Sequence, residues 1–387
     1  MSLYRVSTAN SYDLTLNNIN KRNNELSMTQ QRLSSGKRVM KASDDAVAAT
    51  LAERSQNRLA RVEADKRSLE NARTALTQAE SALGQAGDII HRSRELMVQA
   101  GNPVLTPAMR RDLADQLEAM RTEMLSVANQ TDTAGLPLFG GLGGASAPFY
   151  DEYGANAGVQ FNGQAGQYLP TERALPTAMD GYGIFMQTPQ GNGSFVPLLS
   201  DANAGAMTTS LGSAEELLPE FDTGLAAPDG LGAQVFIVDD GAGNPLVEVK
   251  SVTSRDANGV ADGFGATLFG PQPFRSGETL TFGGTSGTAI KLSLTGQPAI
   301  GDTVDLQPVL NKPGNIFDTM QRAVDALRND QGPALVQSNN RTLQELDSAL
   351  DRILAGRGRV GEWLNRADSM GANFEDRQVF YEKEQSD

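Results

Sequence analysis

Apolar residues recur every seven positions along the stretch that begins near Asp45, and alanines stand three places after most of them. Alternating spacings of three and four keep one stripe of a helix facing a partner helix, and alanine allows the two helices to approach closely. Only Asp65 and Ser93 interrupt the second column. The pattern predicts one helix from about Asp45 to Ala100. Its core row is Val62, Leu69, Leu76, Leu83, Ile90 and Met97.

Three further helices are predicted. Thr106 and Pro107 are typical of an N-cap and a first-turn proline, and they open a helix that we expect to end near Thr131. A short helix contains Ile316 and Leu327, and a longer one follows it. Because very long helices need other helices to bury them, we expect both chain ends to form a long antiparallel coiled-coil or bundle rod. The core residues predicted for the last helix are Leu346, Leu350, Ile353, Val360 and Leu364.

The first forty residues carry an apolar row of their own, in which Asn23 and Gln30 occupy two of the same columns. This pattern predicts an amphipathic helix. Such a row is usually buried within its own chain, but an N-terminal helix with few local neighbours is also suited to pairing with other chains. The candidate assembly residues are Tyr12, Leu16, Ile19, Leu26 and Leu33.

Glycine separates the middle of the chain from its ends, because 31 of the 40 glycines fall between Gly135 and Gly314. Short β-like runs alternate there with turn sequences, and the dense glycines at 140–144 favour a flexible linker. We therefore predict an α+β protein with a β-rich domain inserted into a helical rod. The predicted domains are 1–42 (an N-terminal assembly helix of the inner tube), 43–139 with 315–387 (helical rod) and 140–314 (outer β-rich domain). The predicted strands include 234–238, 247–252, 279–282 and 291–294.

Charge is concentrated in the same middle region. Of the net charge of −14, residues 135–314 contribute most, with 6 basic and 18 acidic side chains, whereas residues 1–134 carry 18 and 16. An acidic surface repels phosphates, so we expect no nucleic-acid partner. No apolar run approaches the roughly 20 residues of a membrane helix, and the polar start lacks the pattern of a cleaved signal peptide. We therefore expect no membrane insertion.

The chain is poor in catalytic residue types. It has no cysteine, which excludes disulfides and thiol nucleophiles, and His91 is its only histidine. A single histidine excludes paired-histidine metal motifs and disfavours histidine-based triads. The acidic pairs at 44–45 and 215–216 are typical of capping or solvated residues, and 239–244 fits a hairpin turn better than a calcium loop. We predict no catalytic, cofactor-binding or metal-binding residues, no cofactor, and no enzyme.

Several segments resemble the flagellin family. They are Leu-Ser-Ser-Gly-Lys-Arg-Val at 33–39, Ser-Asp-Asp-Ala at 43–46 and Ser-Arg-Glu-Leu-Met-Val-Gln-Ala at 93–100. At the other end, Leu-Asp-Ser-Ala-Leu-Asp at 346–351 and Arg-Val-Gly at 359–361 are similar to the family's matching C-terminal helix. The resemblance covers most of 1–134 and 315–387.

Within that family, the sequences at 4–8 and 135–141 are more similar to the hook-filament junction proteins than to flagellin, although Ala46 is flagellin-like. The resemblance implies a structural subunit of the bacterial flagellum that connects the hook-side junction protein to the filament. It implies as partners copies of the same chain in a ring, a neighbouring hook-associated protein, flagellin and an export chaperone. It also implies type III export without a cleaved signal peptide and an extracellular location.

Members of the family end in a further helix that folds back on the N-terminal one, and no such heptad segment precedes Asp387. We therefore expect the N-terminal row to lack a partner within the chain, and residues 1–40 to exchange amide protons rapidly in the monomer. The alternatives are flagellin itself and a coiled-coil signalling protein, which would need a membrane span and a helical hairpin tip. The lack of histidine between 135 and 314 excludes a metalloprotease insert.

Overall fold

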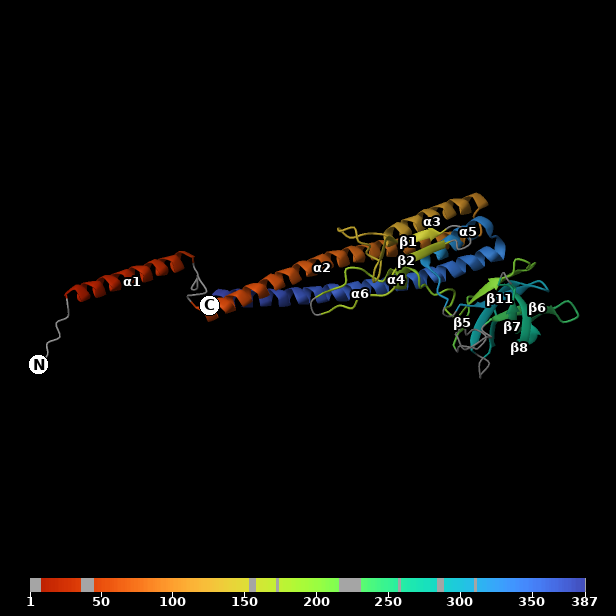
Figure 1. The fold of residues 1–387 in the computed structure, drawn as a ribbon. Coiled ribbons are helices and arrows are strands. Elements are labelled where there is room, and N and C mark those ends of the chain that lie inside the picture. The colour runs from red at the N-terminus through yellow and green to blue at the C-terminus, as the bar shows by residue number, and fades with distance from the viewer. Residues whose placement is uncertain are drawn as a thin grey trace. The chain divides into compact units, whose positions relative to one another are not determined.

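The computed structural model describes residues 8–35, 45–152, 158–171, 174–215, 231–256, 259–283, 289–309 and 312–386. The chain forms two compact units. The first contains residues 1–70, 172–174 and 366–387, and the second contains 71–171 and 175–365. Helices come from both ends of the chain and the strands from its middle, which confirms the predicted α+β class (Figure 1). The motif positions 4–7, 36–39 and 43–44, together with Glu216, lie outside the described residues.

The helices begin and end close to where the pattern predicts. Asp45 caps the long helix, since its Oδ1 accepts hydrogen bonds from the amides of Val47 (3.0 Å) and Ala48 (2.9 Å). Thr106 caps the next by accepting from the Met109 amide at 3.3 Å. That helix ends three residues before the predicted Thr131. The helices are α1 (Thr8–Ser35), α2 (Ala46–Ala100), α3 (Pro107–Ala128), α4 (Gly181–Phe185), α5 (Ile316–Asn329) and α6 (Gly332–Ser386).

In the second unit, α2 and α6 run antiparallel. The Arg94 Nε donates to Asp347 Oδ1 at 2.8 Å, and the Arg357 Nη2 donates to Glu80 Oε1 at 2.6 Å. Residue numbers therefore rise along one helix as they fall along the other. Between these exposed ion pairs, Leu83 of α2 lies beside Gly356 of α6, and Leu350 of α6 lies beside Gly87 of α2.

The first unit contains another part of the same two helices. Ser55 donates to Glu384 Oε2 at 2.9 Å, and the Lys66 ammonium donates to Gln378 Oε1 at 3.1 Å. The order of these pairs is again antiparallel.

Two antiparallel sheets form most of the middle region. One has five strands in the order β3-β11-β6-β7-β8, and the other contains β4, β10 and β5, with β9 also paired to β10. Side chains from both sheets share one buried cluster that includes Val235, Val249, Val304, Ile290 and Leu292, so the sheets pack face to face. The strands are β3 (Phe195–Leu199), β4 (Ala206–Thr209), β5 (Ser213–Ala214), β6 (Ala233–Asp239), β7 (Pro245–Arg255), β8 (Ala261–Pro273), β9 (Thr279–Phe282), β10 (Ile290–Gln297) and β11 (Thr303–Pro308).

The four predicted strands are confirmed, since they lie within β6, β7, β9 and β10. The turn between β6 and β7 is also the predicted hairpin. Asp239 Oδ1 accepts from the amides of Gly241 and Gly243, and Asp240 Oδ1 accepts from that of Asn244. These hydrogen bonds are typical of an Asx turn and explain why acidic residues stand there.

A separate hairpin of β1 (Gly144–Glu152) and β2 (Gly158–Gly163) packs on the helices of the second unit. The ring of Phe149 lies 5.5 Å from that of Phe185 and 5.8 Å from that of Phe317, between ring centroids. The Asn129 side chain holds the hairpin by two hydrogen bonds to the Phe149 backbone, at 2.7 and 2.9 Å. This hairpin therefore shares the helical core.

The glycines before this hairpin are a correction to the sequence analysis, because the expected flexible linker at 140–144 is wrong. Gly141 has a φ of +71°, and a Cβ on it would lie 2.1 Å from the Gln164 carbonyl oxygen. The Gln164 amide donates to the carbonyls of Gly140 (3.2 Å) and Gly143 (2.6 Å). Two backbone segments approach here too closely for side chains, which is why the sequence has glycine.

Candidate functional site

The apolar row of α1 lies exposed to solvent. The helix has no glycine or proline, and the hydroxyls of Thr15 and Thr29 bond back to the carbonyls of Ser11 and Glu25. Most helical stability in proteins comes from packing, so a helix with an exposed apolar row gains that stability only when a partner covers it. The exposed fractions are Tyr12 70%, Leu16 44%, Ile19 52%, Leu26 58% and Leu33 85%. These side chains form the α1 row.

The row of α2 has the opposite environment. Leu76, Leu83, Ile90 and Met97 are all at most 1% exposed in the second unit, and Val62 and Leu69 are buried in the first. Ser93, which interrupts the alanine column, is buried too and donates its hydroxyl to the Ile89 carbonyl at 2.8 Å. A polar residue is tolerated in this seam because the helix backbone satisfies it.

The row of α6 is rotated slightly from the predicted one. Leu346, Ile353 and Val360 are buried, whereas Leu350 and Leu364 are half-buried. The neighbouring residues Ala349 and Trp363 are more deeply buried than these two leucines. The heptad pattern thus identified the buried face of α6, but at two positions the most deeply buried residue is the one just before the predicted leucine.

A second feature is the root of the inserted sheets, which we define as residues 188–191 and 312–315. The chain leaves the helices through the first segment and returns through the second. Thr188 and Gly314 exchange two backbone hydrogen bonds of 2.9 Å each, and the Gln190 side-chain amide donates to the Lys312 carbonyl at 3.1 Å. Departing and returning chains are therefore tied to each other.

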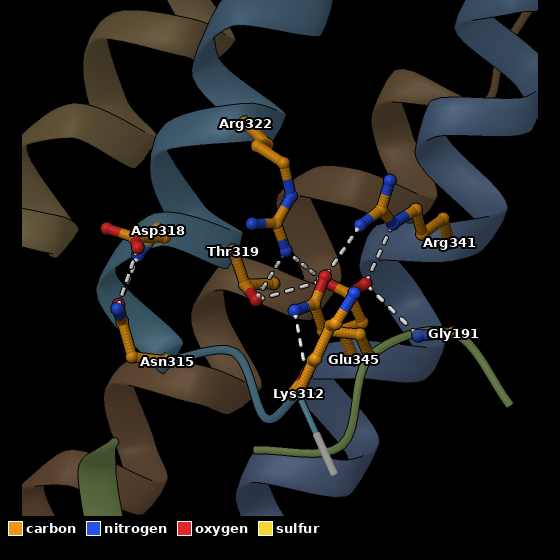
Figure 2. A network of polar contacts seen from close by, with 9 residues as sticks. Gly191, Lys312, Asn315, Asp318, Thr319, Arg322, Arg341 and Glu345 are labelled. Carbon is orange, nitrogen blue, oxygen red and sulfur yellow. Dashed lines mark hydrogen bonds and ion pairs between the residues drawn. The ribbon is translucent and has the colours of Figure 1, made fainter. Parts of the chain in front are cut away.

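Glu345 of α6 lies beside this root, with its side chain 1% exposed (Figure 2). Its Oε1 accepts from Arg341 Nε at 2.8 Å and from the Gly191 amide at 3.2 Å. Its Oε2 accepts from the Thr319 hydroxyl at 2.9 Å and pairs with the Arg322 guanidinium. One carboxylate thus joins α5, α6 and the departing chain.

The surroundings of Glu345 favour its charged form. Burial alone would raise the pKa of this carboxyl. The guanidinium groups of Arg322 and Arg341, with the hydrogen bonds from Arg341 and the Gly191 amide, outweigh burial and hold the pKa below its ordinary value of 4.5. Glu345 is therefore ionised at neutral pH, and its charge is compensated from two helices.

Glu345 belongs to a set of three polar residues on one face of α6, the polar stripe: Gln337, Arg341 and Glu345. They stand four positions apart, so they share that face. Gln337 accepts from the Thr209 amide of β4 and donates to the Pro197 carbonyl of β3, both at 3.3 Å. The sequence analysis missed the stripe. Its spacing was visible, but its partners lie 128 to 154 positions away.

The described residues hold no group of three or more histidine, cysteine, aspartate or glutamate side chains arranged to bind a metal ion. His91 is exposed. Within the same part of the chain, no helix is both long and apolar enough to cross a membrane. The two features that stand out among the described residues are the exposed α1 row and the buried polar contacts of Glu345.

Comparison with known proteins confirms the resemblance to the flagellin family. Residues 6–143 match the bacterial flagellin N-terminal helical region. This match covers α1, α2 and α3, which carry the N-terminal motifs and the α1 row, and it does not include the C-terminal motifs at 346–351 and 359–361.

Among curated proteins, the chain is 33% identical to flagellar hook-associated protein 3 of Salmonella typhimurium over 185 residues, which are 47% of this chain and 56% of that protein. It is 29% identical to flagellar hook-associated protein 3 of Escherichia coli over 238 residues, 58% of this chain and 72% of that one. A flagellin of Clostridium tyrobutyricum is 29% identical over 163 residues, 42% of each chain. The matches thus span between about half and three quarters of the hook-associated relatives.

Solved structures support the same grouping. The flagellar junction protein FlgL from Legionella pneumophila aligns with a TM-score of 0.66 and 25% identity, over 81% of this chain and 98% of that one. FlgL from Xanthomonas campestris aligns with a TM-score of 0.62 and 25% identity, over 86% and 98%. The helical ends and the inserted sheets are therefore an arrangement found in flagellar junction proteins.

Proposed function

We propose that this chain, which carries the flagellin N-terminal helical region and resembles hook-associated protein 3, is a structural subunit that joins hook to filament in the bacterial flagellum. Relatives with this name and FlgL structures that align over nearly their whole length support the proposal. Flagellin is the alternative, because flagellins also match the chain.

The observation that carries the mechanism is the exposed α1 row. Leu16, Ile19 and Leu26 lie exposed on one helix, and fully burying an aliphatic side chain contributes about 1.5–3 kcal/mol. Covering the row between subunits would stabilise an assembly without being needed for the fold of the second unit. We therefore propose the α1 row as a contact between subunits.

In this proposal, residues 1–42 form the assembly segment of the inner tube and 43–139 with 315–387 form the rod. The sequence predicts an outer domain of 140–314, but the β1–β2 hairpin packs on the helices, so we assign to this domain the two sheets between Phe195 and Pro308. Copies of the chain make a ring between a neighbouring hook-associated protein and flagellin, after delivery by an export chaperone. We propose no cofactor and no catalytic activity for this structural role.

Deleting the gene tests the role in cells. We expect cells that retain hooks but shed unassembled flagellin into the medium, because the filament has no junction on which to grow. Loss of a flagellin would instead remove the filament protein itself. Electron microscopy of the hooks and immunoblotting of the medium distinguish the two results. Filaments of normal length and number on the deletion strain would refute the junction role.

Complementation then tests the α1 row. Ile19→Asp with Leu26→Asp places two charges in the row, and we expect hooks without filaments when this variant replaces the native chain. Asn18→Asp with Asn24→Asp adds the same charge to α1 at positions outside the row and should restore filaments. Equal amounts of each exported variant must be confirmed in the medium. Full restoration by the first variant would exclude the row as an assembly contact.

A further inference from the structure

We infer that the polar stripe of α6 is a latch that fixes the inserted sheets on the helices, and that releasing it turns the root into a hinge. Gln337, Arg341 and Glu345 make up this latch. The inference goes beyond the proposed function and does not depend on it, since it concerns the isolated chain.

The two chain segments near the root contain several glycines. The departing chain carries Gly191 with a φ of +51° and Gly193 with a φ of +87°, and the returning chain carries Gly314. Glycine has no side chain to restrict the backbone, but a Cβ on Gly191 would lie 2.7 Å from the Phe195 carbonyl oxygen and one on Gly314 2.9 Å from Gln190 Cγ, so pivoting also requires these close approaches to be released. The hydrogen bonds between Thr188 and Gly314 tie the segments to each other, but they do not fix either segment to a helix. Asn315 joins the returning segment to α5, since its Oδ1 accepts from the Asp318 amide at 2.7 Å, and the contacts that fix the departing segment come from α6.

The stripe reaches three separate parts of the inserted region. Gln337 binds the backbone of β3 and β4. Arg341 Nη2 donates to Gln190 Oε1 at 3.2 Å, and Glu345 accepts from the Gly191 amide. Hydrogen bonds weaken steeply when their distance or angle departs from ideal values. One orientation of the sheets therefore satisfies all three residues, and other orientations break several contacts together.

The contacts of the latch are directional. An apolar interface can slide, because burial of apolar surface has no direction. Glu345 keeps both of its guanidinium partners on α5 and α6, so a movement of the sheets would cost its buried carboxylate the hydrogen bond from the Gly191 amide. The buried hydroxyl oxygen of Thr188 has no hydrogen-bond partner in the described part of the chain, so this residue adds no side-chain tie to the root. Directional hydrogen bonds from α6 thus reach the root and the first strands of the sheets.

Distance measurements between the helices and the sheets test the latch. The chain has no cysteine, so spin labels can be placed on the exposed sites Asp351→Cys in α6 and Ala242→Cys in the β6–β7 turn. Pulsed dipolar spectroscopy on the full chain should give one narrow distance distribution. Adding Glu345→Gln leaves two guanidinium groups without their carboxylate, and we expect a distinctly broader distribution while circular dichroism retains both helix and strand signals.

Two further variants keep the result interpretable. Glu80→Gln removes the carboxylate of an exposed ion pair between α2 and α6, with Arg357, and should leave the distribution narrow. Arg341→Gln removes the hydrogen bond to Gln190 at a less buried position of the latch, and it should also broaden the distance distribution. If Glu345→Gln fails to fold, the Arg341→Gln variant alone tests the latch. A distribution as narrow as the native one in folded Arg341→Gln and, where it folds, in Glu345→Gln would overturn the latch. Broadening in Glu80→Gln to the same extent would overturn it as well.

Discussion

Helices α1 and α2 carry apolar rows with the same spacing, yet one row is exposed and the other is buried. Leu16 and Ile19 of α1 are about half exposed, whereas Leu76 and Leu83 of α2 are almost completely buried. The spacing of apolar residues thus determines that a segment is helical and which face is apolar. It does not determine what covers that face.

The difference comes from what lies opposite each row. In the second unit, α2 has α6 running beside it in the reverse direction, and its alanines allow the two backbones to approach. Gly356 of α6 adds to this close fit, because a Cβ there would lie 3.2 Å from Ile184 and 3.5 Å from Leu83. Most large apolar side chains of the α1 row, by contrast, remain more exposed than buried in the single chain.

The largest expected effect is on the buried row. Leu83→Ala should lower the free energy of unfolding by about 2–5 kcal/mol, because it leaves a cavity in a packed seam. Leu16→Ala makes the same chemical change in α1 and should change that free energy by less than about 0.5 kcal/mol. Urea denaturation followed by circular dichroism measures both. Equal effects of the two substitutions would show that α1 is packed in solution as tightly as α2.

The next largest effect is expected in the polar stripe rather than in the apolar seam. Glu345→Gln should lower the free energy of unfolding by about 2–4 kcal/mol at neutral pH. This is less than for a fully buried ion pair, because Arg322 is partly exposed. The folded-state pKa of Glu345 lies below 4.5, so its stabilisation is present above that pH and is lost as the pH falls through the folded value. The native chain should therefore lose its advantage over the variant in acid. Denaturation at pH 7 and pH 3 checks this, with Leu83→Ala as the control whose cost should depend little on pH.

A smaller effect concerns the start of α2. Asp45→Ala removes the acceptor for two backbone amides and should cost about 1 kcal/mol, whereas Asp45→Asn retains a capping side chain and should cost less. Hydrogen exchange in the first turn of α2 should rise in the alanine variant. Unchanged exchange there would mean that packing, rather than the cap, holds this end.

The most direct test of the comparison between α1 and α2 measures the native chain and changes no residue. We expect amides of residues 8–35 to exchange rapidly in the dilute monomer, because residues 11–34 are exposed and little packing can oppose opening of this part of the helix. Amides of residues 76–97 in α2 should be strongly protected under the same conditions. Mass-spectrometric hydrogen exchange on a verified monomer provides the measurement. Strong protection throughout α1 would contradict the assignment of its row as an uncovered surface.

Local signals allowed much of the fold to be predicted. The heptad row of α2, the Thr106 cap and the Asp239-Asp240 turn each depend on neighbours within a few residues, and the structure agrees with all three. The exposure of the α1 row is consistent with the expected absence of an intrachain partner. Its role in assembly remains a prediction.

Contacts between distant residues could not be predicted in the same way. Gly141 is needed because Gln164 approaches its backbone, and nothing in the local glycine run distinguishes that approach from flexibility. Glu345 resembles any glutamate on a long helix until Gly191 and Thr319 are placed beside it. The centre of the α6 seam depended on the partner helix, which is why Trp363 rather than Leu364 is the more deeply buried.

The pairing of Thr188 with Gly314 has a consequence for how such a protein can change over generations. A segment whose two ends meet in a single β-bridge can be lengthened, shortened or exchanged for another without altering the path of the helices on either side. Recombination at this point would give a lineage new outward surfaces on an unchanged frame. It also gives the protein engineer a natural site for grafting. The replacement domain would either supply backbone partners for the Gln337 side chain, as Thr209 and Pro197 do here, or be combined with a substitution of Gln337.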